Sequence, residues 1–170
     1  MVAGMSKYRR LYHPGGTYFF TVFAAARGQS VLTDHVDLLR AAYRVTVCEL
    51  PVISDAIVIL PDHLHAVWTM PPGDSDFPER WRRIKARFTH ALGQRFPRSP
   101  SKHRKREAGV WQRRYWEHAI RDEADFQHHV EYCWANPVRH GLVAAPMDWA
   151  LSSIHRDHRN GRVPTGWTIP

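Results

Sequence analysis

Two β-prone runs that flank a tight turn constrain the fold of this chain more than any other part of its sequence. Residues 57–60 read Ile-Val-Ile-Leu, Pro61-Asp62 follow, and the chain continues as His63-Leu64-His65-Ala66-Val67-Trp68. Runs of β-branched and aromatic residues bounded by turn residues are typical of strands, so the pattern predicts a β-hairpin. Side chains alternate between the faces of a strand. We therefore expect His63 and His65 on one face and Leu64 on the opposite, buried face.

The histidine pair permits two interpretations. Two imidazoles on one face of a strand, about 7 Å apart along the backbone, can converge on one metal ion or one phosphate. The same pattern also fits two polar residues on the solvent-exposed face of a half-buried strand. The pair alone leaves both interpretations open, and a second element must decide between them.

The first half of the chain alternates strand and helix patterns. Residues 17–24 form a continuous β-prone run, as expected for a central strand that is covered on both faces. Thr33 is expected to cap a helix over about residues 34–49, and residues 52–60 form the next strand. The buried stripe of that helix is predicted to hold Leu38, Ala42 and Val45.

The second half adds two helices. Apolar residues recur at helical spacing between residues 77 and 92, and an acidic first turn at 122–125 begins a last helix that Pro137 is expected to end. The order strand, helix, strand, strand, helix, basic excursion, helix predicts an α+β fold. In that fold an antiparallel sheet has helices packed mainly on one face.

The length of 170 residues suits one well-filled core, so we expect a single domain over 1–170. It would include a basic loop at about 96–108 and a basic C-terminal tail at about 149–170. No stretch approaches the length of a membrane span, and the polar N-terminus lacks an apolar signal-peptide core. We therefore expect a cytoplasmic protein without a membrane partner.

Positive charge is concentrated in one part of the chain. Residues 80–121 hold 14 Lys or Arg against Glu107 and Glu117, whereas the whole chain has a net charge of +8. This asymmetry favours a nucleic-acid partner, and hence a nucleoid-associated protein, over a merely solvated basic face. The candidate DNA contacts are Arg80, Arg82, Arg83, Lys85, Arg87, Arg113 and Arg114.

The last helix changes the interpretation of the histidine pair. His128, Tyr132 and Asn136 recur four residues apart, so Tyr132 can present a phenol on the face from which Asn136 offers an amide oxygen. Two imidazoles and an amide oxygen leave positions open for water and a phosphate oxygen. Mg²⁺ or Mn²⁺ would be a natural occupant, and Zn²⁺ also fits these ligands.

A tyrosine nucleophile has a definite chemical consequence. A phosphotyrosine ester conserves the phosphodiester as a covalent link between protein and DNA, so the bond can be rejoined to the same strand or to another. The proton acceptor is not specified by the sequence, and His128 is one candidate. Tyr115 is the rival nucleophile, but Ala119 occupies the position four residues after it.

Two longer motifs carry a resemblance to a known family. Residues 61–65, Pro-Asp-His-Leu-His, are similar to the His-hydrophobic-His motif of HUH endonucleases. Residues 121–143, with Tyr132 and Asn136-Pro137-Val138, resemble the tyrosine helix and following turn of the REP-associated tyrosine transposases. The likeness extends to Tyr8-Arg9-Arg10, residues 15–22 and 81–85, so it spans most of the chain.

The resemblance implies a ferredoxin-like or RRM-like sheet, and metal-dependent cleavage and rejoining of single-stranded DNA at REP-type palindromic hairpins through a 5′-phosphotyrosine. The family motif maps its nucleophile onto Tyr132 and its metal ligands onto His63, His65 and Asn136. The third ligand of the wider group is often a longer Gln or Glu, where this chain has Asn136. The REP-associated branch resembles monomers, so a monomer is expected.

Two alternatives to the transposase remain. One is a DNA-hairpin-binding protein without catalytic activity, in which the basic segment supplies the affinity. The other is a metal-dependent hydrolase that uses His63, His65 and His128 around a nucleophilic water. Only a covalent protein–DNA adduct is unique to the tyrosine mechanism.

Overall fold

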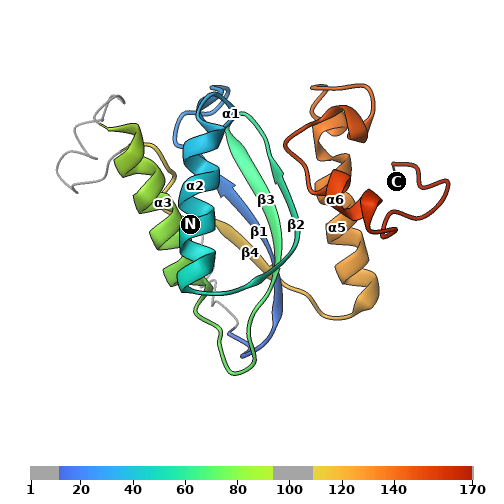
Figure 1. Ribbon diagram of the computed structural model, residues 1–170, viewed down its shortest axis with the longest axis horizontal. Coiled ribbons are helices and arrows are strands. Elements are labelled where there is room, and N and C mark those ends of the chain that lie inside the picture. The colour runs from blue at the N-terminus through green and yellow to red at the C-terminus, as the bar shows by residue number, and fades with distance from the viewer. Residues whose placement is uncertain (1–11, 94–108, 170) are drawn as a thin grey trace, which may run out of the picture.

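A four-stranded antiparallel sheet organises the residues that this computed structural model describes, which are 12–93 and 109–169 (Figure 1). The strands lie in the spatial order β2-β3-β1-β4. Their bounds are β1 Thr17–Phe23, β2 Ile53–Ile59, β3 His63–Thr69 and β4 Trp116–Ala119. β2 and β3 form the predicted hairpin around residues 60–62, and β3 pairs with β1 on its other side.

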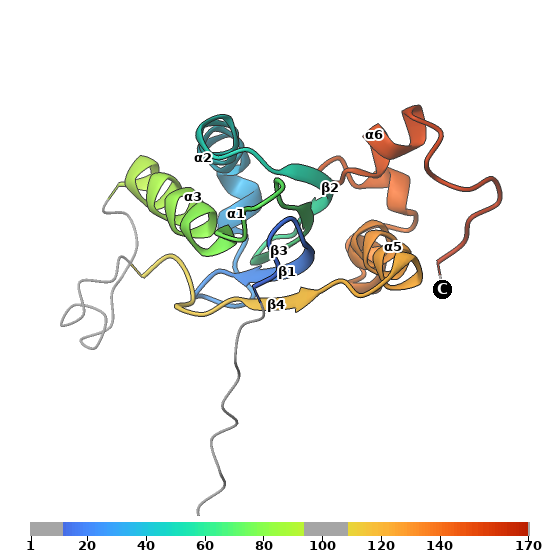
Figure 2. The same ribbon diagram turned by 90° about the horizontal axis from the view of Figure 1, so that it is seen from below.

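Helices cover both faces of this sheet. Figure 1 shows α2 and α3 on one side of the strands and α5 and α6 on the other, and Figure 2 shows the chain passing from β4 into α5. The helix bounds are α1 Val31–Asp34, α2 Val36–Glu49, α3 Phe77–Leu92, α5 Glu123–Arg139 and α6 Ile154–Arg159, with a short 3₁₀ helix, η1, at Pro146–Asp148.

The α+β class is confirmed. The chain order β1, α2, β2, β3, α3, β4, together with the spatial order of the strands, is the split βαβ arrangement of ferredoxin-like folds. Its two crossover helices, α2 and α3, share one face, and α5 is added on the other face. The face that carries α5 is the one on which the candidate site lies.

Alternation along the strands divides the core into two layers. Phe20 of β1 and Leu64 of β3 pack with α2 and α3, where Trp68 stacks on Trp81 at 4.1 Å between ring centroids. Phe19 lies on the opposite face of β1, in a cluster that includes residues of α5. The prediction that β1 is covered on both faces is therefore confirmed.

Three predicted details of the helices are wrong. Thr33 does not cap the helix that begins at Val36, because it lies inside the short α1 and His35 is the N-cap residue. Val45 is exposed, because α2 buries Leu39, Ala42 and Thr46. The Thr46 hydroxyl donates to the Ala42 carbonyl at 2.8 Å, which satisfies a polar group that the apolar pattern could not indicate. Pro137 does not end α5, since its missing amide removes only one helical hydrogen bond.

The C-terminal tail packs on α5 and on the edge of the sheet. Asp157 of α6 accepts a hydrogen bond from the Trp134 indole at 3.1 Å, and Trp149 donates to the Ile59 carbonyl at 2.9 Å. The predicted basic loop at 96–108 lies outside the described residues. None of the helices in the described part of the chain combines the length and apolar character that crossing a bilayer requires.

Candidate active site

Both histidines of the pair lie on an inner strand and face α5. β3 is hydrogen-bonded to β1 and β2, so its backbone is held on both sides. His63 and His65 are each only 4% exposed, and their ring centroids are 5.0 Å apart. Leu64 between them packs in the opposite layer, as predicted. The pair is therefore a buried, converging arrangement and not the exposed polar face of a strand.

One nitrogen of each imidazole is held by a neighbouring oxygen. His63 Nδ1 lies 2.6 Å from Asp62 Oδ1, and His65 Nδ1 lies 2.9 Å from the hydroxyl of Thr21, which is its cross-strand partner. With the proton on Nδ1 in both rings, each Nε2 keeps its lone pair. His65 Nε2 is buried and has no hydrogen-bond partner. Orientation of this kind is typical of metal-binding histidines.

Burial controls the protonation of these imidazoles. It lowers the pKa of His65 to about 3, with the nearby His63 and His140 adding to the effect. Burial also lowers the pKa of His63, although its contact with Asp62 opposes the shift. A neutral imidazole is the form that binds a metal ion. The site therefore has the required form of His65 well below neutral pH.

Asp62 is itself fixed by the loop after β1. Its Oδ2 accepts a hydrogen bond from the Gly28 amide at 2.7 Å and lies 3.2 Å from Arg27 Nε. Burial would raise the pKa of Asp62, but the Gly28 amide, His63 and Arg27 together lower it. Gly28 has φ of 75°, a conformation that favours glycine. Asp62 and Thr21 were missed by the sequence analysis, because neither residue type marks a ligand without its partner.

Helix α5 places Tyr132 beside the histidines. The ring centroid of Tyr132 is 5.2 Å from that of His65 and 5.7 Å from that of Phe19. The Arg139 guanidinium lies 5.3 Å from the centroid of the tyrosine ring. Tyr132 and the histidine pair lie on separate elements, so the sequence could only suggest that they are close together. The fold brings them together.

Asn136 lies one turn further along α5 and is 1% exposed. Its side chain neighbours His65, yet its Oδ1 and His65 Nε2 are both buried without a hydrogen-bond partner. Leaving two such acceptors unsatisfied is costly. A cation between them would satisfy both atoms, so the residues present fit a divalent metal ion.

A cavity of about 500 Å³ opens over these residues. His63, His65 and Tyr132 line it, as does the exposed His128 that was considered as proton acceptor. His140, at the end of α5, also lines it, with its ring centroid 5.0 Å from that of His63. His140 is exposed and is the C-cap residue of α5, so its position beside His63 follows from where that helix ends.

A second histidine cluster lies at the start of α5. His118 Nε2 is 2.8 Å from Asp125 Oδ2, and His129 Nδ1 is 2.8 Å from the Asp125 carbonyl oxygen. The donor atoms of these three residues lie within 4.8 Å of one another, close enough for a metal ion. Arg121 also contacts Asp125 Oδ2 at 3.0 Å. The hydrogen bonds among these three residues, together with the contact from Arg121, already satisfy Asp125. The cluster therefore serves to link β4 to α5.

Arg80 corrects the predicted set of DNA contacts. Its side chain is 1% exposed, and its guanidinium donates to Asp74 at 2.6 Å and to the Pro51 carbonyl at 2.8 Å. Arg80 cannot bind phosphates on the solvent side of α3, because its guanidinium N–H groups already donate to acceptors inside the protein. The amphipathic pattern predicted an exposed Arg80, but its partners come from the segment after α2 and from the loop that precedes α3.

The other basic residues of α3 lie on the layer opposite the histidines. Arg82 and Arg83 pair with Glu79, and Arg87 pairs with Glu49 at 2.7 Å. The remaining candidates differ in their surroundings: Lys85 donates to the Gln112 carbonyl, whereas Arg113 and Arg114 are exposed in the segment that precedes β4. That segment leads directly to Trp116, which lines the cavity of Tyr132.

Comparison with known proteins identifies the family of this chain. No family model matches it. It is 44% identical over 163 residues to the REP-associated tyrosine transposase of Escherichia coli (strain K12), covering 96% of this chain and 91% of that protein. It is 42% identical over 166 residues to a putative REP-associated tyrosine transposase of Haemophilus influenzae, covering 96% and 93%.

A solved structure agrees with these relatives. The structure of a REP-associated tyrosine transposase bound to a REP hairpin superposes with a TM-score of 0.85 at 44% sequence identity, covering 96% of this chain and 92% of that chain. The sheet that brings the histidines of β3 to Tyr132 is therefore shared with a protein of that name. On this sequence and structural agreement, the chain belongs to the REP-associated tyrosine transposases.

Proposed function

We propose that this transposase cuts and rejoins single-stranded DNA at REP-type palindromic hairpins through a covalent bond between Tyr132 and a 5′-phosphate. One observation carries the proposal: the phenol ring of Tyr132 lies 5.2 Å from His65, beside two buried acceptor atoms that lack partners. The relative that was solved with a REP hairpin supports the choice of DNA substrate.

The proposed metal ligands are His63, His65 and Asn136, and Mg²⁺ or Mn²⁺ suits this mixture of nitrogen and oxygen atoms. A divalent ion bound there would supply Lewis acidity to the scissile phosphate. Asp62 and Thr21 would hold the two imidazoles in the required tautomer through the contacts at Nδ1. The depressed pKa of His65 keeps that ring neutral for the same purpose.

Tyr132 would act as the nucleophile. Its phenolic oxygen forms a bond to phosphorus while the bond from phosphorus to the 3′-oxygen breaks, so one phosphodiester replaces another. The phenol loses a proton and the leaving 3′-oxygen ends as a hydroxyl. His128 lines the same cavity and is exposed to solvent, which suits a group that accepts this proton and passes it to water.

Arg113 and Arg114 are proposed as the principal DNA contacts of the candidate set. They are exposed, and they precede the β4 residue that lines the active-site cavity. Arg82, Arg83 and Arg87 lie on the other layer and are already paired with carboxylates. Phosphate contact by those three would require exchange of existing ion pairs. We further propose that a single copy of the chain suffices, because β3 and α5 of one chain complete the site.

A covalent-adduct assay tests the nucleophile. A labelled REP-type hairpin with single-stranded flanks is incubated with Mn²⁺, and adducts are resolved on a denaturing gel. Wild type should form an adduct that leaves a free 3′-hydroxyl, whereas Tyr132→Phe should form none. Tyr115→Phe is the matched control, since it removes the hydroxyl of the rival tyrosine, and it should retain the adduct.

The same assay separates the alternatives. An adduct that persists in Tyr132→Phe would overturn the assignment of the nucleophile. Cleavage by wild type that yields free phosphate termini without any adduct would indicate a hydrolase with a water nucleophile. Tight hairpin binding that is independent of metal, with no cleavage of any tested hairpin, would indicate a binding protein.

A further inference from the structure

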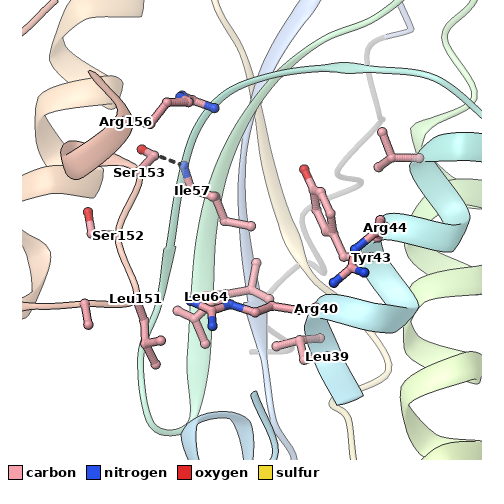
Figure 3. Close-up of a pocket in the computed structure, with 13 residues that line it drawn as sticks. Leu39, Arg40, Tyr43, Arg44, Ile57, Leu64, Leu151, Ser152, Ser153 and Arg156 are labelled. Carbon is pink, nitrogen blue, oxygen red and sulfur yellow. Dashed lines mark hydrogen bonds between the residues drawn. The ribbon is translucent and has the colours of Figure 1, made fainter. Parts of the chain in front are cut away.

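A second cavity lies on the sheet face opposite Tyr132. It has a volume of about 480 Å³ and separates α2 from the segment 150–156. Figure 3 shows Leu39, Arg40 and Tyr43 on the α2 side and Leu151 on the other side, with strand residues between them. Its volume lies within the range of about 300–1,000 Å³ that is typical of small-ligand sites.

The wall opposite α2 is fixed to the edge of the sheet. The Ile59 amide donates to the Leu151 carbonyl at 2.9 Å, and the Ser153 amide donates to the Ile57 carbonyl at 2.8 Å. Ser153 Oγ in turn accepts from the Ile57 amide at 3.1 Å. The cavity is therefore preformed by backbone hydrogen bonds, and a ligand would not have to order this wall.

Two cations at the cavity lack any partner within the described residues. Arg40 and Arg44 are both exposed and line the cavity, and neither makes a hydrogen bond or ion pair there. They lie one helical turn apart, where like charges repel and destabilise a helix. By contrast, the Arg156 guanidinium is occupied by the Ser54 carbonyl and Asp157. The free positive charge of the cavity thus belongs to α2.

The other polar groups of the cavity are engaged. The Tyr43 hydroxyl donates to Ser54 at 3.0 Å and accepts from the Trp68 indole at 2.9 Å. Ser152 Oγ accepts from the Ile154 amide at 3.2 Å. What remains for a ligand is an apolar floor, the face of the Tyr43 ring and two guanidinium groups. Such a surface suits a flat apolar group that carries a negative charge. Apart from the two guanidinium groups, its described residues offer no free polar group that could recognise the hydrogen-bonding edge of that ligand.

We propose that this cavity binds an unpaired nucleotide of the single-stranded DNA that flanks the hairpin. The base would pack on the apolar floor and Tyr43, and Arg40 and Arg44 would bind its phosphates. The Cβ atoms of residues four apart on a helix are about 5–6 Å apart, so both side chains can reach one phosphate or two successive ones. The inference rests on the proposed function for the DNA itself, but it assigns a separate contact on the opposite face of the sheet.

The charge complementarity can be tested with the double variant Arg40→Ala/Arg44→Ala in the full chain. Affinities are measured by fluorescence anisotropy for one hairpin with and without unpaired flanks. The variant should bind the flanked hairpin about tenfold or more weakly than wild type does, and should keep its affinity for the hairpin without flanks. The dependence of affinity on salt should fall by about 0.7 in logarithmic slope for each phosphate that the variant no longer binds.

Arg113→Ala/Arg114→Ala is the matched control, since it removes the same charge at the other candidate surface. It should weaken binding of both hairpins to a similar extent. Equal losses of affinity for the two hairpins in Arg40→Ala/Arg44→Ala would overturn the cavity assignment, because they would indicate only a general field effect.

A second measurement does not depend on the hairpin. Oligothymidine that carries a photoactivatable 4-thiothymidine is cross-linked to wild type, and the modified peptides are mapped by mass spectrometry. Cross-links should fall in α2 and in 150–156, and should be absent in Arg40→Ala/Arg44→Ala. Cross-links confined to other peptides would refute the proposal. If these cross-links form while no Tyr132 adduct does, the proposed function fails and the nucleotide site stands.

Discussion

Acid should destabilise the metal-free protein through His65. In the folded state burial lowers the pKa of this imidazole to about 3, against 6.5 for the ordinary side chain. Between these two values the unfolded chain binds a proton that the folded chain does not. Lowering the pH therefore favours unfolding, and the free energy of unfolding falls as the pH drops from about 6.5 toward 3.

The size of this loss of stability depends on how far the pH lies below the pKa of His65 in the unfolded state. At pH 5.0 the side chain of the unfolded state lies 1.5 units below its pKa of 6.5, which corresponds to about 2 kcal/mol at 1.36 kcal/mol per unit. At pH 7.5 the same contribution is close to zero. His63 and His129 also have lowered pKa values because they are buried, so wild type should lose more than this single contribution.

Urea unfolding followed by tryptophan fluorescence measures the effect in EDTA at pH 7.5 and 5.0. His65→Asn removes the titration, so the loss of stability between the two pH values should be smaller by about 2 kcal/mol than in wild type. This readout is a difference between two pH values, and it is insensitive to any constant cost of the substitution. His158→Asn, at an exposed position, should behave like wild type. The reasoning is refuted if His65→Asn loses as much stability as wild type.

Two further predictions concern residues that hold others in place. Asp62→Asn weakens the orienting contact at His63 Nδ1, so Mn²⁺ affinity measured by calorimetry should fall about 10–100-fold with the fold intact; an unchanged affinity would show that this contact does not orient the ligand. Arg80→Ala leaves Asp74 and two loop carbonyls without their buried donor, and should cost about 3–5 kcal/mol in urea unfolding. Arg82→Ala on the same helix should cost much less, because the Arg82 side chain is exposed and its ion pair with Glu79 is screened by water; equal costs for these two arginines would contradict the role assigned to Arg80.

The hydrogen-bonded cluster that links β4 to α5 gives a structural reason why Tyr132 can be placed accurately. Asp125 holds His118 of β4 and His129 of α5 at the start of the tyrosine helix. At the other end of that helix, Asn136 is buried against the sheet. A nucleophile held at both ends of its helix loses little entropy when the phosphate arrives, which favours reaction.

Local periodicity determined much of this protein. The two-residue repeat of a strand placed His63 and His65 on one face whatever lay above them, and the helical repeat placed Tyr132 and Asn136 on one stripe. These features depend only on backbone geometry within one element. For this reason the hairpin, the long helices and the two halves of the site could be predicted before the fold was known.

Tertiary structure alone decided what those elements meet. Thr21 reaches His65 because β1 pairs with β3 in one register, and Arg80 is buried because loop carbonyls distant in sequence surround it. In the sequence, Arg40 and Arg44 have the pattern of ordinary surface charges. Only the packing of residues 150–156 opposite α2 shows that they line a cavity. A charge or an imidazole has the same local pattern with or without a partner, so its burial and its pKa are set only where separate segments pack together.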